Sequence, residues 1–156
     1  MAVLGISANT RHLGMAVIRK HALIDFKIQL YKERWSDKKA NRMIGSLHCC
    51  IKEHSITSIA LVIPYAYHLT PQTSVLIDRI KAHCRQKKIR ISTYHPQALH
   101  CFCQAAKAKK KMLIKEMVRH YPELGTVYQK ELKNKNKYYC KLFEAVGAAT
   151  LLSREH

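Results

Sequence analysis

The first thirty residues alternate between apolar runs and short polar breaks. Apolar residues dominate positions 2–8 and 13–20, and positions 22–31 mix apolar with polar residues. Runs of this length between polar breaks are typical of β-strands. The pattern therefore predicts three consecutive strands, although residues 21–25 hold no strong turn signal to mark the boundary between the second and the third.

The following segment changes to a helical period. Ser36 is a suitable N-cap, and apolar residues then recur every three or four positions from Ala40 to Ile51, so a helix is expected up to about Glu53. The stretch "ITSIALVI", residues 56–63, is apolar on both faces, as in a central strand that is covered on both sides. Pro64 ends this strand.

The second half is predicted to be mainly helical. Thr70 and Pro71 form a typical helix start, and this helix should end in the basic run at 85–88. Further elements are expected in the order of a strand at 89–94, a helix from His95 to about Ala106, a helix that ends at Tyr121-Pro122, and a last helix over about 138–153. Residues 123–137 are polar and basic, and we predict a mobile connection there.

This order of elements predicts the fold class. Three strands in series and then alternating helices and strands indicate an α/β protein with a mixed five-stranded sheet, antiparallel at the start and parallel later, with helices on both faces. The 156 residues contain no internal repeat and no linker. A single domain over 1–156 is expected, because a chain of this length can bury a core of its own.

The charge balance points to a class of partner. The chain has 28 Lys and Arg against 10 Asp and Glu, a formal net charge of +18. Such an excess attracts polyanions, so nucleic acid is the first partner to consider. A membrane surface is not expected, because no basic helix carries a broad apolar face with Trp and Phe. A generally basic surface without a specific partner is the alternative interpretation.

The six cysteines favour a reducing compartment. None of them forms a Cys-x-x-Cys pair, and several occupy apolar helical positions. The N-terminus lacks the features of a secretory signal, and no stretch approaches the ~18 apolar residues of a membrane span. We therefore expect a cytoplasmic protein with reduced cysteines. Zinc binding is disfavoured for the cluster of His95, His100, Cys101 and Cys103, because the two cysteines point in different directions on a helix and no second pair lies at finger spacing.

Several segments resemble one enzyme family. "LGISANTRHLGMAVI" is similar to the opening strand pair of the RuvC-type Holliday junction resolvases of the ribonuclease-H-like superfamily, which usually reads Leu-Gly-Ile-Asp, a short turn, then Gly and a second strand. "SIALVIPYAYHLTPQTSVLIDRIKAHCRQKKIRISTYHPQAL" resembles their fourth strand, long helix, fifth strand and following helix in spacing. "KKKMLIKEMV" resembles their basic helix, and "FEAVGAATLL" their closing helix. The resemblance covers nearly the full length and implies a ribonuclease-H-like, RuvC-like fold.

The positions that bind metal in this family are occupied differently here. Family enzymes gather carboxylates from the first strand, the fourth strand and the last helix around two Mg²⁺ ions. The first position is Ser7, the second falls at Ile63 or Pro64 with no acid from 56 to 71, and the closing helix retains only Glu144, with Cys140 or Lys141 one turn earlier. We therefore predict a degenerate site, in which Ser7, Pro64 and Glu144 are vestigial, no catalytic residue is intact, and no metal or other cofactor is bound. Glu144 is the only metal-ligand candidate.

The basic residues are expected to survive as a binding surface. Lys111 matches a family lysine close to the scissile phosphate, His100 falls near another basic family position, and Arg11 and His12 lie in the first turn at the same rim. Nearby tyrosines such as Tyr65 and Tyr67 more usually lie at the edge of a core than stack on bases. We expect phosphate contacts from Arg11, His12, Lys107, Lys109, Lys110, Lys111, Lys115, Arg119, Lys133, Lys135 and Lys137.

Two other functions stay open. One is an active Mg²⁺-dependent, structure-selective endonuclease with relocated ligands, for which Asp25 and Asp78 are the available acids, although their spacing does not bring them toward Ser7. The other is a protein-interaction scaffold for an acidic partner. DNA as the nucleic acid, and a homodimer, are implied by the resemblance alone.

Overall fold

A mixed five-stranded sheet forms the centre of the protein. The computed structural model describes residues 1–99, 110–133 and 139–155. The strands are β1 (Ala2–Ala8), β2 (His12–Arg19), β3 (Ala22–Leu30), β4 (Ile56–Val62) and β5 (Arg90–Tyr94). Their order in the sheet is β3-β2-β1-β4-β5, with β1, β2 and β3 antiparallel and β4 and β5 running parallel to β1. The predicted fold class is confirmed.

A two-residue turn joins β2 to β3. Lys20 and His21 both have left-handed backbone angles, with φ of 52° and 63°. Tight hairpins commonly use two residues of positive φ, because the twist of such turns matches the twist of the strands, but Asn-Gly or Asp-Gly is the usual sequence. The Lys-His pair explains why the sequence pattern marked no boundary here.

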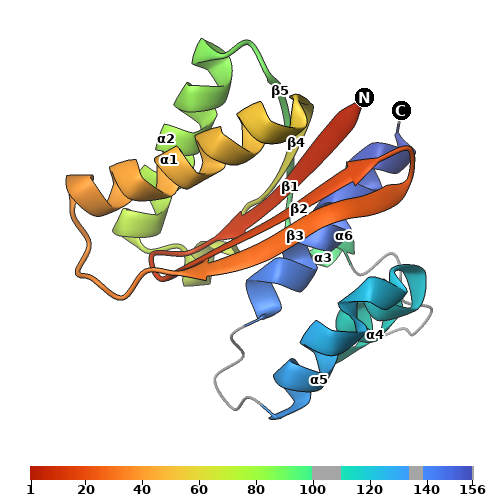
Figure 1. The fold of residues 1–156 in the computed structure, drawn as a ribbon. Coiled ribbons are helices and arrows are strands. Elements are labelled where there is room, and N and C mark those ends of the chain that lie inside the picture. The colour runs from red at the N-terminus through yellow and green to blue at the C-terminus, as the bar shows by residue number, and fades with distance from the viewer. Residues whose placement is uncertain (100–109, 134–138, 156) are drawn as a thin grey trace.

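Helices cover both faces of the sheet (Figure 1). On one face lie α1 (Asp37–His54) and α2 (Pro71–Gln86), and their predicted N-caps are confirmed, because Ser36 accepts from the Lys39 amide and Thr70 from the Thr73 amide. On the other face lie α3 (Pro96–Leu99), α4 (Lys110–His120) and α6 (Cys140–Arg154). A short 3₁₀ turn, η1 (Ala66–His68), joins β4 to α2.

The last helix, α6, lies directly against the strands. Every residue from Leu142 to Thr150 is buried, because the sheet packs on one side of α6 and α3 and α4 on the other. Two glycines allow this close packing. A Cβ atom at Gly5 would lie 1.9 Å from the Ala145 carbonyl oxygen, and one at Gly14 would lie 2.5 Å from the Lys141 backbone. The first turns of α6 are thereby fixed beside the ends of β1 and β2.

The segment after Tyr121 differs from the prediction. Instead of a mobile connection over 123–137, the chain forms a 3₁₀ turn, η3 (Pro122–Leu124), and the helix α5 (Gly125–Lys133), while 134–138 fall outside the described residues. Leu124 is fully buried, and Val127 and Tyr128 pack against the core around α6. These three residues are spaced as in a helix. The prediction was wrong because the numerous lysines obscured that spacing.

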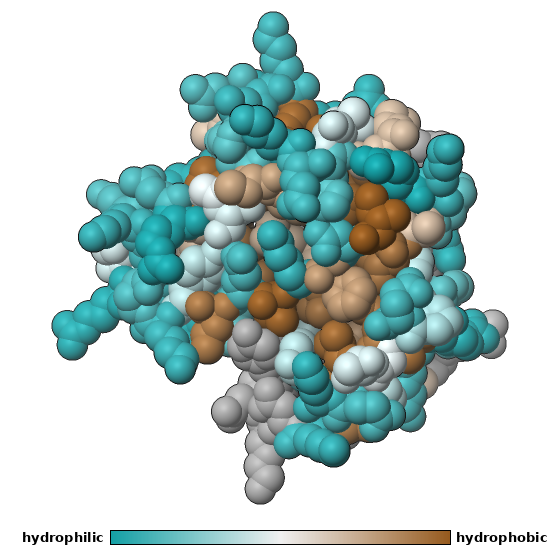
Figure 2. Space-filling model, viewed as in Figure 1, coloured by the Kyte–Doolittle hydropathy of each residue, from teal (hydrophilic) through white to brown (hydrophobic). Residues whose placement is uncertain are grey.

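Most of the surface in this view is hydrophilic (Figure 2). Hydrophobic side chains show in the middle of the face, where the edge of the sheet lies between the α1/α2 layer and the α4/α5 pair. Ile24 and Leu30 on the edge strand β3 are 42% and 36% exposed. Within the described residues, no helix combines the length and the apolar character that crossing a bilayer requires.

Candidate nucleic-acid interface

Ser7 and Glu144 lie together beneath one end of the sheet. Ser7, near the end of β1, donates from its Oγ to Glu144 Oε1 at 3.0 Å, and the two residues are 1% and 5% exposed. They are 137 residues apart in the chain and meet because α6 packs against β1 and β2 without intervening side chains at Gly5 and Gly14. The structure thus brings together two of the three positions predicted to be vestigial.

Lys141 completes this cluster. Its Nζ lies 3.1 Å from the same Glu144 Oε1 that accepts from Ser7, and its side chain is 20% exposed. A buried carboxylate is stable only with a partner of opposite charge or several hydrogen bonds. One ammonium balances the single charge of Glu144, so this carboxylate is electrostatically satisfied by groups of the chain itself.

A groove opens beside the cluster. It has a volume of about 430 Å³, and Pro64, two residues after the end of β4, contributes to its wall. Its other walls come from the turn after β1, from η1 and from the starts of α2, α3 and α6; the described lining residues are Asn9, His12, Pro64, Tyr65, Tyr67, His68, Thr73, Pro96, Cys140, Lys141 and Glu144. Glu144 is the only acid among these described residues, so the groove presents a single carboxylate.

The turn after β1 supplies a basic rim. The Asn9 side-chain oxygen accepts from the backbone amides of Arg11 and His12, at 2.8 and 2.7 Å, which fixes the turn. Arg11 is exposed, and His12 faces the groove. Burial lowers the pKa of His12 below its ordinary value, and the positive charges of Arg11 and Lys141 lower it further. His12 thus lines the groove, and Arg11 precedes it in the same turn; their contact with phosphate stays a prediction.

Aromatic rings form the opposite wall. The rings of Tyr65 and Tyr67 stack with their centroids 5.3 Å apart and an interplanar angle of 5°. The centroid of the His68 ring lies 4.3 Å from that of Tyr67. Tyr67 is 77% exposed, which corrects the expectation of a residue at the edge of the core. Exposed, stacked rings are the surface on which unpaired bases can stack. The sequence showed the tyrosines but not that η1 would place them beside Ser7 and Glu144.

The start of α4 lies next to the groove. Leu113 and Ile114 line an apolar hollow together with Tyr65, Pro96 and Glu144. Lys115 follows on the exposed side of this helix, and Arg119, one turn later, pairs with Glu116 at 2.8 Å. An exposed ion pair of this kind contributes little and can exchange its carboxylate for a phosphate.

The other predicted phosphate contacts are placed only in part. Lys133 is exposed at the end of α5, and Lys110 and Lys111 begin α4. The remaining predicted contacts, Lys107, Lys109, Lys135 and Lys137, lie outside the described residues, as do His100, Cys101 and Cys103. Their role stays a prediction.

Neither acid considered as a relocated metal ligand lies at the groove. Asp25 is on β3, where it pairs with Val17, and its carboxylate contacts His54 at the end of α1. Asp78 is exposed on α2 and is not among the described residues that line the groove. The described part of the chain therefore offers no replacement for the carboxylates missing around Ser7.

Comparisons with known proteins bear on the fold. A sequence search finds neither a matching family model nor a matching curated protein. The structure, however, superposes on RuvC from Thermus thermophilus with a TM-score of 0.74 at 14% identity, over 99% of this chain and 96% of that one. For T. thermophilus RuvC in complex with a Holliday junction substrate, the TM-score is 0.75 at 13% identity, over 96% and 91% of the two chains.

The structure also superposes on a viral resolvase over nearly the full length of both chains. The Fowlpox virus resolvase in complex with Holliday junction DNA matches with a TM-score of 0.64 at 11% identity, over 99% of this chain and 98% of that one. Identities this low establish the fold and nothing finer. The chain therefore has the RuvC-like form of the ribonuclease-H-like fold.

Proposed function

We propose that this protein binds DNA, and branched DNA in particular, in the groove beside Ser7 and Glu144, and that it does not cleave DNA by two-metal hydrolysis. The observation that carries the proposal is the contact of Lys141 with Glu144. It puts an ammonium group, supplied by the chain, on the one carboxylate that the described residues bring to the groove.

The charges and rings around the groove support binding of nucleic acid. Arg11 is cationic and exposed in the turn after β1, His12 lines the groove, and Lys115 adds an exposed charge on α4. Each phosphate that such groups neutralise releases condensed counterions, which favours binding at moderate salt. Tyr67, stacked on Tyr65, offers a surface for any base that becomes unpaired. Two resolvases with the same fold have been solved with Holliday junction DNA.

The same residues argue against cleavage. Two Mg²⁺ ions at working distance need several hard oxygen ligands, most of them carboxylates that offset the ionic charge. Here the Ser7 hydroxyl is neutral and donates to Glu144, Pro64 has no ligand atom in its side chain, and Lys141 already neutralises Glu144. A Mg²⁺ ion would have to displace that ammonium and enter a basic surrounding. The groove does not fit a two-metal centre, so the positive charge offered to phosphate has to come from unneutralised side chains such as the exposed Arg11 and Lys115.

Dimerisation belongs to the same proposal. A four-way junction has approximate two-fold symmetry, and a protein dimer related by a two-fold axis would offer one groove to each side of it. Sedimentation equilibrium with and without junction DNA measures this, and we expect two chains per junction. One chain per junction would restrict the proposal to a single groove.

The test combines binding and cleavage in the same samples. Fluorescence anisotropy measures affinity for a labelled four-way junction, a duplex and a single strand of matched sequence, with EDTA or with Mg²⁺, and denaturing gels then score cleavage. We expect tightest binding to the junction in EDTA, no loss of affinity without Mg²⁺, and intact DNA throughout. Arg11→Ala should weaken binding, whereas Lys87→Ala, which removes an equal charge at the far end of α2, should not. Mg²⁺-dependent cutting would favour an active endonuclease, and absence of DNA binding would favour a scaffold for an acidic protein.

A further inference from the structure

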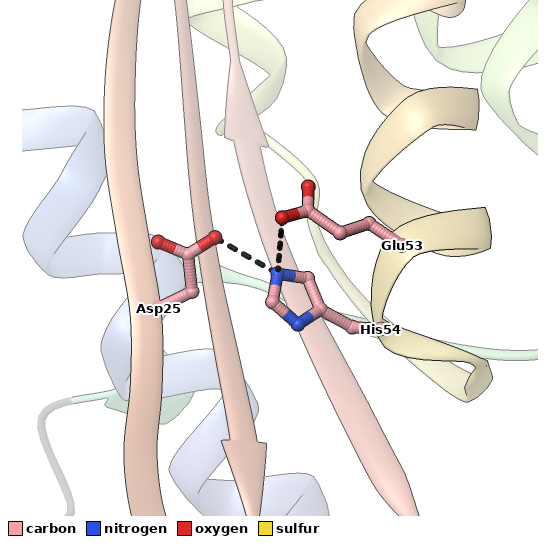
Figure 3. Close-up of side chains that lie close together, drawn as sticks. All are labelled: Asp25, Glu53 and His54. Carbon is pink, nitrogen blue, oxygen red and sulfur yellow. Dashed lines mark hydrogen bonds and ion pairs between the residues drawn. The ribbon is translucent and has the colours of Figure 1, made fainter.

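A second cluster of potential ligands lies far from the groove. Asp25 on the edge strand β3 and the last two residues of α1, Glu53 and His54, point toward one another (Figure 3). The strand β4 begins just after α1, where Ile56 pairs with Ala2, whereas Ser7 lies near the other end of β1. The cluster and the Ser7–Glu144 site are therefore at opposite ends of the sheet.

A β-bulge turns Asp25 toward α1. The register between β2 and β3 shifts so that Val17 faces Asp25 and Ile18 faces Leu23, which leaves Ile24 unpaired. Because side chains alternate along a strand, one inserted residue moves its neighbours to opposite faces. Leu23 and Phe26 accordingly pack against the α6 side of the sheet, and Asp25 lies on the α1 side.

His54 is held with its ring facing the two carboxylates. Arg19 donates to the His54 carbonyl oxygen at 2.7 Å, and Ser55 ends the helix with a left-handed backbone at φ 52°. The ring nitrogen Nε2 lies 2.9 Å from Asp25 Oδ2 and 4.0 Å from Glu53 Oε1. The His54 side chain is only 16% exposed, so this nitrogen is directed into the cluster and not into solvent.

The distances between the three ligand atoms suit an ion with tetrahedral coordination. The three ligand atoms all lie within 4.8 Å of one another. Ligand atoms bonded to one zinc ion lie roughly 3.3–3.5 Å apart, since each is about 2.0–2.2 Å from the metal. The observed 2.9 and 4.0 Å bracket that value, so small side-chain rotations of Glu53 and Asp25 would complete the geometry.

We propose that Asp25, Glu53 and His54 bind a divalent ion of the zinc class, with water in the fourth position, and that the ion fastens the edge strand β3 to the end of α1. An imidazole nitrogen with two carboxylates favours Zn²⁺ over Mg²⁺ and Ca²⁺, which prefer oxygen ligands alone. In a chain of net charge +18, two adjacent carboxylates form a local negative site for such a cation. Cys50, one turn before His54, is buried in the core and is not among the clustered ligand atoms.

The test measures Zn²⁺ binding by the full chain in metal-free buffer, using competition with a chromogenic zinc chelator. The chain has ten histidines and six cysteines that could bind zinc elsewhere, so the comparison between variants is decisive. Asp25→Asn, Glu53→Gln and His54→Gln should each lower the affinity for one bound Zn²⁺ ion by at least about tenfold. The matched controls are His83→Gln, which removes a histidine that contacts His48 between α1 and α2, and Glu33→Gln, which removes an exposed acid paired with Arg42. Neither control should change the affinity for this Zn²⁺ ion, and equimolar Mg²⁺ should not compete with Zn²⁺ for the site.

Side-chain NMR of the histidines gives an independent readout. We expect Zn²⁺ to shift the His54 ring nitrogens first, at one equivalent. The Glu53 side chain is 65% exposed, so Glu53→Gln should fold normally even if the other two variants do not. The proposal is overturned if Glu53→Gln binds Zn²⁺ as the wild type does, or if the His54 ring is unchanged when one equivalent has bound.

Discussion

Lys141 and Glu144 lie one turn apart on α6, and the Lys141 ammonium nitrogen is 3.1 Å from Glu144 Oε1. Ser7 donates to the same oxygen, so two donors from different elements converge on one buried carboxylate. Removing one member of such a group leaves an uncompensated charge or polar atom, which is costly in a buried place. This relationship gives the first prediction.

Breaking the pair should destabilise the fold. Lys141→Met leaves the Glu144 carboxylate with Ser7 alone, and Glu144→Gln leaves the Lys141 ammonium without its counterion. We expect each change to lower the free energy of unfolding by about 1–3 kcal/mol, and the double variant to cost less than the sum, because the two residues act together. Urea denaturation measures these values. Glu33→Gln, in an exposed pair with Arg42, should cost no more than about 1 kcal/mol. If the losses in free energy of unfolding for Lys141→Met and Glu144→Gln simply add in the double variant, the contact between the two side chains contributes nothing to stability.

Placing a carboxylate at position 7 should create a dependence on Mg²⁺ without creating a nuclease. In Ser7→Asp, two carboxylates would face each other where a hydroxyl now donates at 3.0 Å. Their repulsion should lower the melting temperature in EDTA, and millimolar Mg²⁺ should recover part of the loss, whereas the wild type should melt alike in both buffers. Cleavage of branched DNA should stay absent, since Pro64, just after β4, still supplies no acid. DNA cutting by this variant would show that two carboxylates suffice.

DNA binding should strengthen on acidification through His12. Its pKa is lowered mainly by burial and also by Arg11 and Lys141, so His12 is neutral at pH 7 and gains charge only below its ordinary pKa of 6.5. A phosphate in the groove would favour the protonated form. Junction affinity should therefore rise as pH falls below about 6.5, and His12→Gln should reduce this rise. His83→Gln is the matched control, because His83 also has a lowered pKa but lies between α1 and α2.

The lowered pKa of His12 should make the folded protein less stable on acidification, whereas DNA binding becomes stronger. The unfolded state binds protons at pH values where the folded His12 remains neutral, so acidification from pH 6.5 toward the folded pKa should lower the free energy of unfolding. Urea denaturation between pH 7 and 5 measures this, and His12→Gln should flatten the slope. Stability that fell equally in the variant would assign the effect to other groups.

Glycines at the α6 contact should tolerate no side chain. A Cβ at Gly14 would lie 2.5 Å from the Lys141 backbone, so Gly14→Ala should displace the first turn of α6 and destabilise the protein by about 1–3 kcal/mol. Gly45 on α1 is a control, because nothing lies within 4 Å of its Cβ position. Gly45→Ala should stabilise the helix by about 0.5–1 kcal/mol. A neutral Gly14→Ala would mean that α6 can shift freely.

The lysine run at 109–111, which leads into α4, should set the salt dependence of binding. Changing Lys109, Lys110 and Lys111 to Ala should weaken junction binding and make the log–log salt slope shallower by roughly one unit for each phosphate that these lysines neutralise. Anisotropy titrations at several salt concentrations measure the slope, with Lys87→Ala as the control. An unchanged slope would show that this run is only a solvated surface.

The sequence by itself determined the order of the strands and of most of the helices. Local geometry and burial that varies within a few residues produce the signals that were read. These are the apolar runs of strand length, the helix starts at Ser36 and Thr70, and the mainly apolar segment 56–63. They were enough to predict the mixed sheet, with helices on both faces, that the structure confirms. The resemblance at Ser7 and Glu144 also identified two residues that prove to be in contact.

Only the tertiary structure decided which side chains meet. The contact of Lys141 with Glu144 depends on the close packing of α6 that Gly5 and Gly14 allow, and Asp25 faces His54 only because a bulge at Ile24 reverses its side of the sheet. The helix α5 was missed because its few apolar residues become a helical signal only where the core around α6 receives them. Contacts over such long separations in the chain arise from packing between elements, and local periodicity carries no information about them.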